Sequence, residues 1–209
     1  MWYHKYVYDS ESQKLIGEFE KLYQEGEREG LDAWHQDSLA TREDVLIAQS
    51  MLSDLKSSES IAGIIDIGCG KGTLAHHLFP TAKNYLGIDV SATAISAARQ
   101  NFPNMNFVRA DVQNGQDLAD LVSHRFVGEL DLVFSCQTLS FVNDWKSVVE
   151  LSAKLSRALL VVLYLPSNPI GRVKSFGELV DEFWRNFEKI QCTFSVSASH
   201  IAISGVSGR

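Results

Sequence analysis

The sequence lacks several features that would each assign it to a class of protein. Only three of its 209 residues are cysteine, at positions 69, 136 and 192. A small, odd and scattered set argues against a disulfide scaffold and against a metal site, and it favours a reducing, cytoplasmic location. The chain opens without the apolar core of a signal peptide, and its longest apolar run, residues 158–166, is too short to span a bilayer.

A surplus of basic charge is also missing. The chain carries 19 Lys and Arg against 26 Asp and Glu, a formal net charge of −7. Residues 1–60 hold 6 basic and 13 acidic side chains, whereas residues 61–209 hold 13 of each, so the whole surplus lies in the N-terminal segment. No basic stripe is present, which argues against DNA or structured RNA as a partner. The acidic segment is either a solvated helical face or a field that favours a neutral or cationic substrate.

The remaining composition is ordinary for a soluble globular protein, with 45% hydrophobic and 22% charged residues. A chain of this length can bury a substantial core, and we expect residues 1–209 to form one domain. Residues 1–60 are expected to form a helical segment in front of an α/β core made by residues 61–209. The sequence contains no internal repeat that would suggest another architecture.

The most informative stretch is residues 64–72, Ile-Ile-Asp-Ile-Gly-Cys-Gly-Lys-Gly, which predicts a strand that runs into a glycine turn. Gly68 and Gly70 allow a sharp reversal and a close approach of a ligand to the backbone, and Gly72 allows the next helix to pack on the sheet. The spacing is not the G-x-G-x-x-G of dinucleotide sites, and Asp66 would repel a pyrophosphate. Asp66 suits an ammonium group, so a phosphate-free nucleoside with an amino acid tail, S-adenosylmethionine, meets both demands.

Two further predicted strands also end in acids. Residues 85–90 lead to Asp89, which lies where a second-strand carboxylate grips ribose hydroxyls. Asp89 could alternatively cap the following helix. Residues 106–112 lead to Asp111, which could accept from an adenine amino group or could be a turn residue. Three carboxylates are thereby expected at one edge of the sheet.

From residue 64 to about 167 the sequence resembles the class I S-adenosylmethionine-dependent methyltransferases, especially the small-molecule branch. Three segments carry the resemblance: DIGCGKG, LGIDVSATAISAARQNFPNMNFVRAD and DLVFSCQTLSFVNDW. The resemblance implies a transferase that uses S-adenosyl-L-methionine, releases S-adenosyl-L-homocysteine and methylates an N, O or carboxylate group of a small molecule. It also implies a set of cofactor contacts: Asp66, Gly68, Cys69, Gly70, Gly72, Asp89, Val90, Asp111, Val112, Ser135 and Cys136.

The same resemblance implies a Rossmann-like, seven-stranded, mostly parallel sheet with helices on both faces, a C-terminal antiparallel hairpin and an N-terminal helical lid. Ser10 with Gln13 predicts the start of a first helix, residues 26–38 read as a loop, and Thr41 with Asp44 predicts a second helix to about residue 55. Further helices are expected over 73–78, 92–101, 116–124, 145–156 and 175–186, with strands over 130–135, 158–165, 188–197 and 200–206.

Methyl transfer is an in-line displacement, so most of the rate can come from alignment of nucleophile, methyl group and sulfur. A base is needed only for a protonated acceptor. Many relatives carry His where this chain has Ser140, so no base is inferred from that motif. The N-terminal histidines His35 and His4 are the candidate bases, although the aromatic residues around them could merely dock a lid. Arg42 could bind the methionine carboxylate of the cofactor or form a surface ion pair.

Three alternatives stay open. A nicotinamide-dependent oxidoreductase is disfavoured by the glycine spacing and by Asp66. A methyltransferase for a protein or RNA substrate, and a non-catalytic relative that only binds the cofactor, are not excluded by sequence. The methyl acceptor and the oligomeric state are left open.

Overall fold

The structure is a computed structural model. It describes residues 2, 4–9, 11–12, 14–32, 34, 36–58, 61–82, 84–166 and 171–208. No helix in this part of the chain is long and apolar enough to cross a membrane.

A seven-stranded sheet forms the centre of the molecule, with strand order β5-β4-β3-β6-β7-β9-β8. All neighbouring strands are parallel except β9, which runs antiparallel to both β7 and β8. The predicted mixed sheet with a C-terminal antiparallel hairpin is therefore confirmed. The strands are β3 Gly63–Ile67, β4 Asn84–Asp89, β5 Asn106–Arg109, β6 Leu132–Cys136, β7 Ala158–Tyr164, β8 Lys189–Phe194 and β9 His200–Val206.

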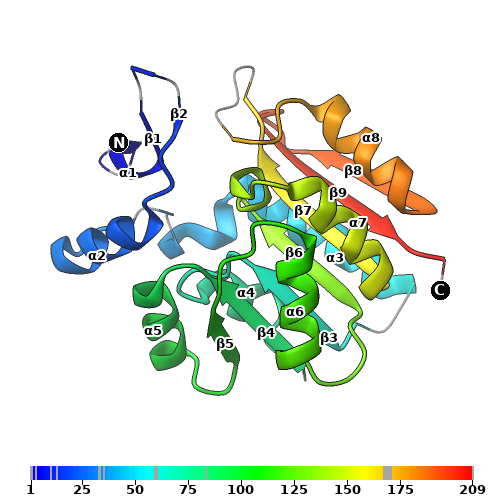
Figure 1. Ribbon diagram of the computed structural model, residues 1–209, viewed down its shortest axis with the longest axis horizontal. Helices are drawn as coiled ribbons and strands as arrows, with labels where there is room; N and C mark the ends of the chain where they lie inside the picture. Colours follow the sequence, from blue (N-terminus) through cyan, green and yellow to red (C-terminus); the bar gives the residue numbers. More distant parts are fainter. Residues whose placement is uncertain are drawn as a thin grey trace.

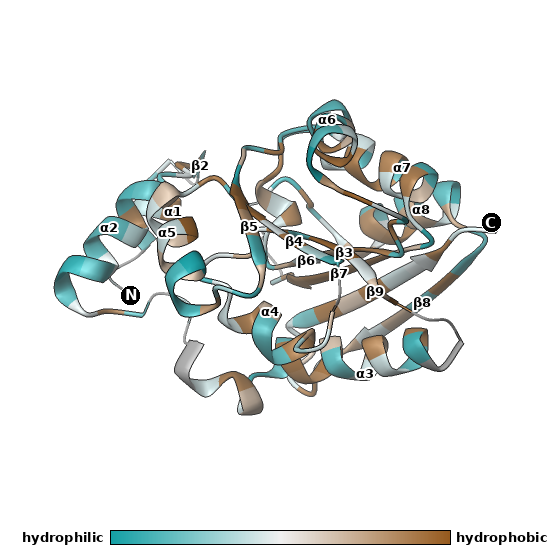
Figure 2. Ribbon diagram, turned by 90° about the horizontal axis from the view of Figure 1, so that it is seen from below, coloured by the Kyte–Doolittle hydropathy of each residue, from teal (hydrophilic) through white to brown (hydrophobic). Residues whose placement is uncertain are grey.

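Helices cover both faces of the sheet, as predicted. Helices α3, α4 and α5 share one buried cluster with one face, and α6, α7 and α8 share a second cluster with the other. Figure 2 shows α6, α7 and α8 on one side of the sheet and α3 and α4 on the other. Their bounds are α3 Glu43–Ser58, α4 Thr73–Leu78, α5 Ala92–Asn101, α6 Gly115–Arg125, α7 Trp145–Leu155 and α8 Phe176–Asn186, with a short helix η2 Leu139–Phe141.

The two covered faces explain why the central strands read as continuous apolar runs. Every residue of β3 and β6 is buried, as is typical of parallel strands packed on both sides. The chain leaves β3 toward β4 on one side and returns to β6 on the other, so the sheet has a topological switch point between β3 and β6. Ligands of open α/β sheets bind at the carboxyl ends of the strands beside such a point.

The N-terminal segment contains α1 His4–Val7, a hairpin of β1 Tyr8–Asp9 with β2 Lys14–Leu15, α2 Phe19–Glu29 and η1 Gln36–Thr41. Figure 1 shows these elements, in blue, beyond the α5 end of the sheet, with the two chain termini at opposite ends of the molecule. Helix α2 contacts α5. The segment is thus placed over one end of the sheet, where a lid was expected.

Two predictions in this segment are wrong. A helix from Ser10 was expected, but residues 11–12 form a turn, residues 14–15 form β2, and the helix begins at Phe19. Ser10 and Gln13 themselves lie outside the described residues. The strand forms because the Ile16 N–H bonds to the Val7 carbonyl at 2.9 Å, and this pairing across the turn outweighs the local capping pattern.

The predicted loop over 26–38 is also wrong at both ends, because α2 covers its start and η1 Gln36–Thr41 covers its last residues. Helix α2 continues through Gly26 and ends at Glu29, with Gly30 as its left-handed cap at φ 64°. Trp2 packs over Gly26, where a Cβ atom would come within 3.5 Å of its ring. In the C-terminal hairpin, β8 ends at Phe194 rather than at residue 197, because residues 195–199 form the turn, whereas β9 has the predicted bounds.

Candidate active site

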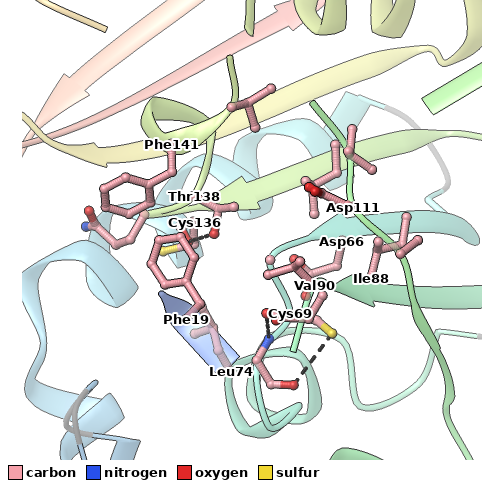
Figure 3. Close-up of a pocket in the computed structure, with 18 of the residues that line it drawn as sticks. Phe19, Asp66, Cys69, Leu74, Ile88, Val90, Asp111, Cys136, Thr138 and Phe141 are labelled. Carbon is pink, nitrogen blue, oxygen red and sulfur yellow. Dashed lines mark hydrogen bonds between the residues drawn. The ribbon is translucent and has the colours of Figure 1, made fainter. Parts of the chain in front are cut away.

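A cavity of about 150 Å³ opens at the carboxyl ends of β3, β4 and β6, beside the switch point. Figure 3 shows Phe19 and Phe141 at one end of this cavity and Asp111 at the other. Nine of the eleven predicted cofactor contacts line it, namely Asp66, Gly68, Cys69, Gly70, Asp89, Val90, Asp111, Val112 and Cys136.

Asp66 is a buried carboxylic acid with one neutral partner. It is 3% exposed, and the Tyr85 hydroxyl donates to its Oδ2 at 2.8 Å. Burial raises the pKa of Asp66 to about 7, with a smaller contribution from nearby Asp89, while the Tyr85 hydrogen bond opposes the rise. A carboxylate in this position is stabilised by a positively charged ligand group.

The glycine turn brings the backbone close to neighbouring groups. Gly68 has φ 84°, and a Cβ atom there would lie 1.9 Å from Thr138 Oγ1. The amides of Gly68 and Cys69 both donate to the Ile88 carbonyl, at 2.8 and 3.0 Å. Gly72, with φ 80°, precedes α4 and packs against the Phe107 ring, where a Cβ atom would lie 2.7 Å away. Gly72 is not among the lining residues.

Asp89 ends β4 with both oxygens held by backbone amides. Gly70 N–H donates to Oδ2 at 3.0 Å and Ser91 N–H to Oδ1 at 2.9 Å. Burial raises the pKa of Asp89 in spite of these bonds. The side chain of Ser91, not that of Asp89, caps helix α5, because it accepts from Ala94 N–H. The remaining lone pairs of Asp89 are therefore available to a ligand in the cavity.

The other predicted contacts differ in exposure. Asp111 is exposed and accepts from the Gln113 side chain at the rim. Ser135 is buried in β6 but does not line the cavity, and its hydroxyl has no partner among the described residues. Burial raises the pKa values of Cys69 and Cys136 well above the usual range, so both thiols stay protonated and serve as wall rather than nucleophile.

Arg42 lines the cavity and forms a buried ion pair rather than a surface one. Its Nε lies 3.0 Å from Asp44 Oδ1, and its Nη2 bonds to Oδ2. Nη1 donates to the Trp34 carbonyl at 2.6 Å. The Arg42 side chain is 21% exposed and that of Asp44 only 5%. Asp44 lies in the first turn of α3, where a sequence pattern indicated only a cap.

Aromatic side chains from the N-terminal segment close the cavity. Phe19 and Tyr23 come from α2, and Trp34 follows it in the chain. The Phe19 ring lies 5.2 Å from the ring of Phe141 in η2, so the segment meets the sheet edge directly. The four-residue spacing of Phe19 and Tyr23 on one helix face is the sequence signal for this wall.

The structure describes only one of the two candidate bases. His35 lies outside the described residues. His4 is in α1, with Nδ1 3.2 Å from the Tyr8 hydroxyl, and it is not among the lining residues. Burial lowers the pKa of His4.

Sequence reasoning gave no site role to Gln137. This residue follows β6 at φ 59°, an uncommon value for a side chain with a Cβ atom. Its Oε1 accepts from Tyr164 N–H at 2.7 Å, and its backbone N–H donates to Val162. Backbone strain of this kind is often concentrated at functional sites. The available signal was its position directly after the strand at the switch point.

Comparison with known proteins agrees with this geometry. Residues 65–159 match a family model described as a methyltransferase domain. Trans-aconitate 2-methyltransferase of Escherichia fergusonii is 32% identical over 114 residues, which cover 53% of this chain and 41% of that protein. Ubiquinone biosynthesis O-methyltransferase of Erwinia tasmaniensis is 31% identical over 96 residues, 44% of this chain and 37% of that protein. The chain thus spans well under half the length of these relatives.

Solved structures share the fold. Magnesium protoporphyrin IX methyltransferase from Synechocystis, with bound S-adenosylhomocysteine, aligns with a TM-score of 0.57 at 15% identity, covering 83% of this chain and 84% of that one. An S-adenosylmethionine-dependent methyltransferase from Clostridium acetobutylicum aligns with a TM-score of 0.62 at 12% identity, covering 91% and 98%.

Proposed function

We propose that this chain, which belongs to the class I S-adenosylmethionine-dependent methyltransferases, transfers the sulfonium methyl group of that cofactor to a small molecule. The observation that carries the proposal is the pair of acids beside the glycine turn, Asp66 at the end of β3 and Asp89 at the end of β4. Asp66 is a buried carboxylate whose one partner among the described residues is a tyrosine hydroxyl, which suits an ammonium group. Asp89 is oriented by two backbone amides and suits ribose hydroxyls.

The cofactor would supply an activated methyl group on a positively charged sulfur. The protein's own contribution would be alignment and exclusion of water. Asp66 would hold the ammonium group of the amino acid tail, Asp89 would hold the ribose, and Asp111 would meet the adenine amino group. The wall of Cys136 and Phe141 would face the reacting atoms. Because the sulfonium charge disperses during transfer, the leaving thioether needs no acid.

A small acceptor is supported by the shape of the cavity. Phe19 and Trp34 from the N-terminal segment close it opposite the sheet edge, which leaves little room for a folded macromolecule. The sequence also lacks the basic surplus that an RNA-binding face needs. The named relatives act on trans-aconitate and in ubiquinone biosynthesis, both small-molecule settings.

If the acceptor arrives protonated, we propose His35 as the first base to test and His4 as the second. Both belong to the N-terminal segment that closes the cavity. His35→Ala should lower turnover far more than cofactor affinity, and unchanged turnover with the true acceptor would remove His35 from the mechanism. The three cysteines are free thiols, which supports the cytoplasmic location proposed for the protein.

The decisive experiment is calorimetry with S-adenosylmethionine and S-adenosylhomocysteine, followed by a screen of small acceptors for S-adenosylhomocysteine release. Wild-type protein should bind both ligands, and Asp89→Asn should weaken binding by about tenfold or more. Tight cofactor binding without turnover on any acceptor would favour a non-catalytic binding protein. Absence of cofactor binding would reject the proposed function.

A further inference from the structure

The cavity contains one arginine, and its charge is already matched. Among the described lining residues, Arg42 is the only lysine or arginine. Burial opposes its charge, but the two-point bond to Asp44 outweighs this and raises the pKa of Arg42. Burial likewise opposes ionisation of Asp44, and Arg42 keeps the pKa of that carboxyl below its usual value. Both groups are therefore charged, and the pair is neutral.

Asp44 is built into the wall behind Arg42. It is 4% exposed and accepts from Val45 N–H at 3.0 Å and from Gln137 Nε2 at 3.4 Å. The amide of Gln137 is oriented for this contact because Tyr164 N–H occupies its oxygen. The carboxylate is thus fixed by several elements, and Arg42 cannot turn into the cavity without losing a buried counter-charge.

The remaining ionisable groups of the cavity include three acids, Asp66, Asp89 and Asp111. The carboxylate of the cofactor would itself compete with an anionic acceptor for the Arg42 N–H groups that do not bond to Asp44 or Trp34. An anionic acceptor would therefore enter without a counter-charge.

The cavity walls contributed by the N-terminal segment and η2 are aromatic. Phe19 and Phe141 lie 5.2 Å apart, and Tyr23 and Trp34 extend the same surface. Such walls favour a flat apolar body and attract cations above their faces. Shape and charge thus point to the same class of acceptor.

We propose that the acceptor has a flat apolar body and no negative charge, and that Asp44 sets this preference by compensating the positive charge of Arg42. This inference rests on the proposed methyl transfer and deepens it. It separates this chain from a polycarboxylate methyltransferase, although one relative acts on trans-aconitate. Asp44 acts here as a positioning residue, through Arg42.

The test uses three phenols of similar shape: 4-hydroxyphenylethanol, 4-hydroxyphenylethylamine and 4-hydroxyphenylacetate. Their binding to the complex with S-adenosylhomocysteine is measured by calorimetry. Wild-type protein should bind the alcohol and the amine about tenfold or more tightly than the acid. Asp44→Asn frees the Arg42 charge, so binding of the acid should improve about tenfold relative to the alcohol. Asp44→Glu should keep the wild-type order.

Glu150→Gln is the control for net charge. Glu150 is exposed, pairs with Lys154 on α7 and does not line the cavity. It should leave the order of the three ligands unchanged. The double variant Arg42→Gln with Asp44→Asn should lose the gain for the acid. A merely structural role of Asp44 would weaken all three ligands alike.

Equal binding of the acid and the alcohol to the wild-type protein would overturn the proposal. So would an Asp44→Asn variant that shows no gain in binding the acid relative to the alcohol. A result in which neither protein binds any of the three phenols would also overturn it. If Asp44→Asn does not fold, the wild-type order decides. Failure of the proposed function is seen separately, as a wild-type protein that does not bind S-adenosylmethionine at all.

Discussion

The Glu20 carboxylate accepts a hydrogen bond from the Ser91 hydroxyl at 2.6 Å. It also accepts from the Thr93 hydroxyl at 2.8 Å and from the Thr93 amide at 3.3 Å. Glu20 lies on α2 and its partners lie at the start of α5, so a negative charge sits at the positive end of a helix dipole. Ser91 N–H in turn donates to Asp89. Helix α2 and Asp89, the acid proposed to bind ribose, are thus joined through the hydrogen bonds of one turn at Ser91.

Glu20→Gln should loosen this contact. Burial opposes ionisation of Glu20, but the bonds from Ser91 and Thr93 outweigh it and lower its pKa to about 2. The stabilisation is present above the usual pKa of about 4.5 and is lost as pH falls toward 2. We expect a loss of about 1 kcal/mol in the free energy of unfolding at pH 7, measured in urea, because Glu20 is only partly buried.

The same variant should also weaken S-adenosylmethionine binding several-fold, chiefly through a faster dissociation rate, because α2 carries Phe19 and Tyr23 into the cavity. Glu18→Gln is the matched control, since Glu18 pairs only with Lys21 on the exposed face. If Glu20→Gln changes cofactor dissociation no more than Glu18→Gln does, α2 is not coupled to the cofactor.

Gly68→Ala should damage both the fold and the cofactor site. The added Cβ atom would lie 1.9 Å from Thr138 Oγ1, and the backbone would keep φ 84°. We expect a loss of roughly 2 kcal/mol or more in unfolding free energy, together with loss of S-adenosylmethionine binding. Gly177→Ala is the control, because its Cβ atom would come no closer than 3.9 Å to any neighbour and α8 favours alanine. Equal melting temperatures of the two variants would contradict the prediction.

The core was predictable because its signals are local. Continuous apolar runs mark strands buried on both faces, and α4 and α5 begin and end where sequence reasoning placed them. The hairpin of β1 and β2 was missed because a capping pattern and a helix-like periodicity are equally compatible with a short hairpin followed by a helix. That choice depends on the Ile16–Val7 bond, which no local pattern encodes.

Site residues that directly follow a strand could be predicted from the sequence. Site residues whose role depends on contacts between distant segments of the chain could not. Asp66 and Asp89 are identified by their positions after apolar runs. The bond from Ser91 to Glu20 joins residues 71 apart, and Gln137 meets Asp44 across 93 positions. For Arg42 the sequence left a cofactor contact and a surface ion pair open. It did not indicate a pair inside the cavity wall, because a short spacing between an arginine and an acid does not show whether the two side chains are buried.

Cofactor affinity should depend on pH through Asp66. The pKa of this acid is about 7 in the free protein, because it is buried. The ammonium group of the cofactor binds the ionised form, so affinity should fall about tenfold per pH unit below about 7. It should fall again above about 8, where an α-amino group loses its proton. Calorimetry from pH 5.5 to 9 should show this maximum, and Asp66→Asn should remove the acid limb of the profile.

The same shift makes Asp66 a destabilising group in the free protein. Its folded pKa of about 7 exceeds its ordinary value of 3.8, so the unfolded chain releases the proton first as pH rises. The free energy of unfolding should therefore fall by about 4 kcal/mol between about pH 4 and pH 7 and then level off. Urea unfolding across this range would test the slope, and Asp66→Asn should flatten it.

Tyr85→Phe should move both profiles to higher pH. The Tyr85 hydroxyl donates to Asp66 at 2.8 Å, and among the described residues it is the one group that stabilises the ionised form of Asp66. Without that bond the pKa of Asp66 rises further, so S-adenosylmethionine binding at pH 7 should weaken about tenfold and recover at higher pH. Tyr164→Phe is the control, because that tyrosine is 53% exposed and lies at the end of β7. A uniform loss of affinity at every pH would mean that Tyr85 only shapes the wall and does not set the charge of Asp66.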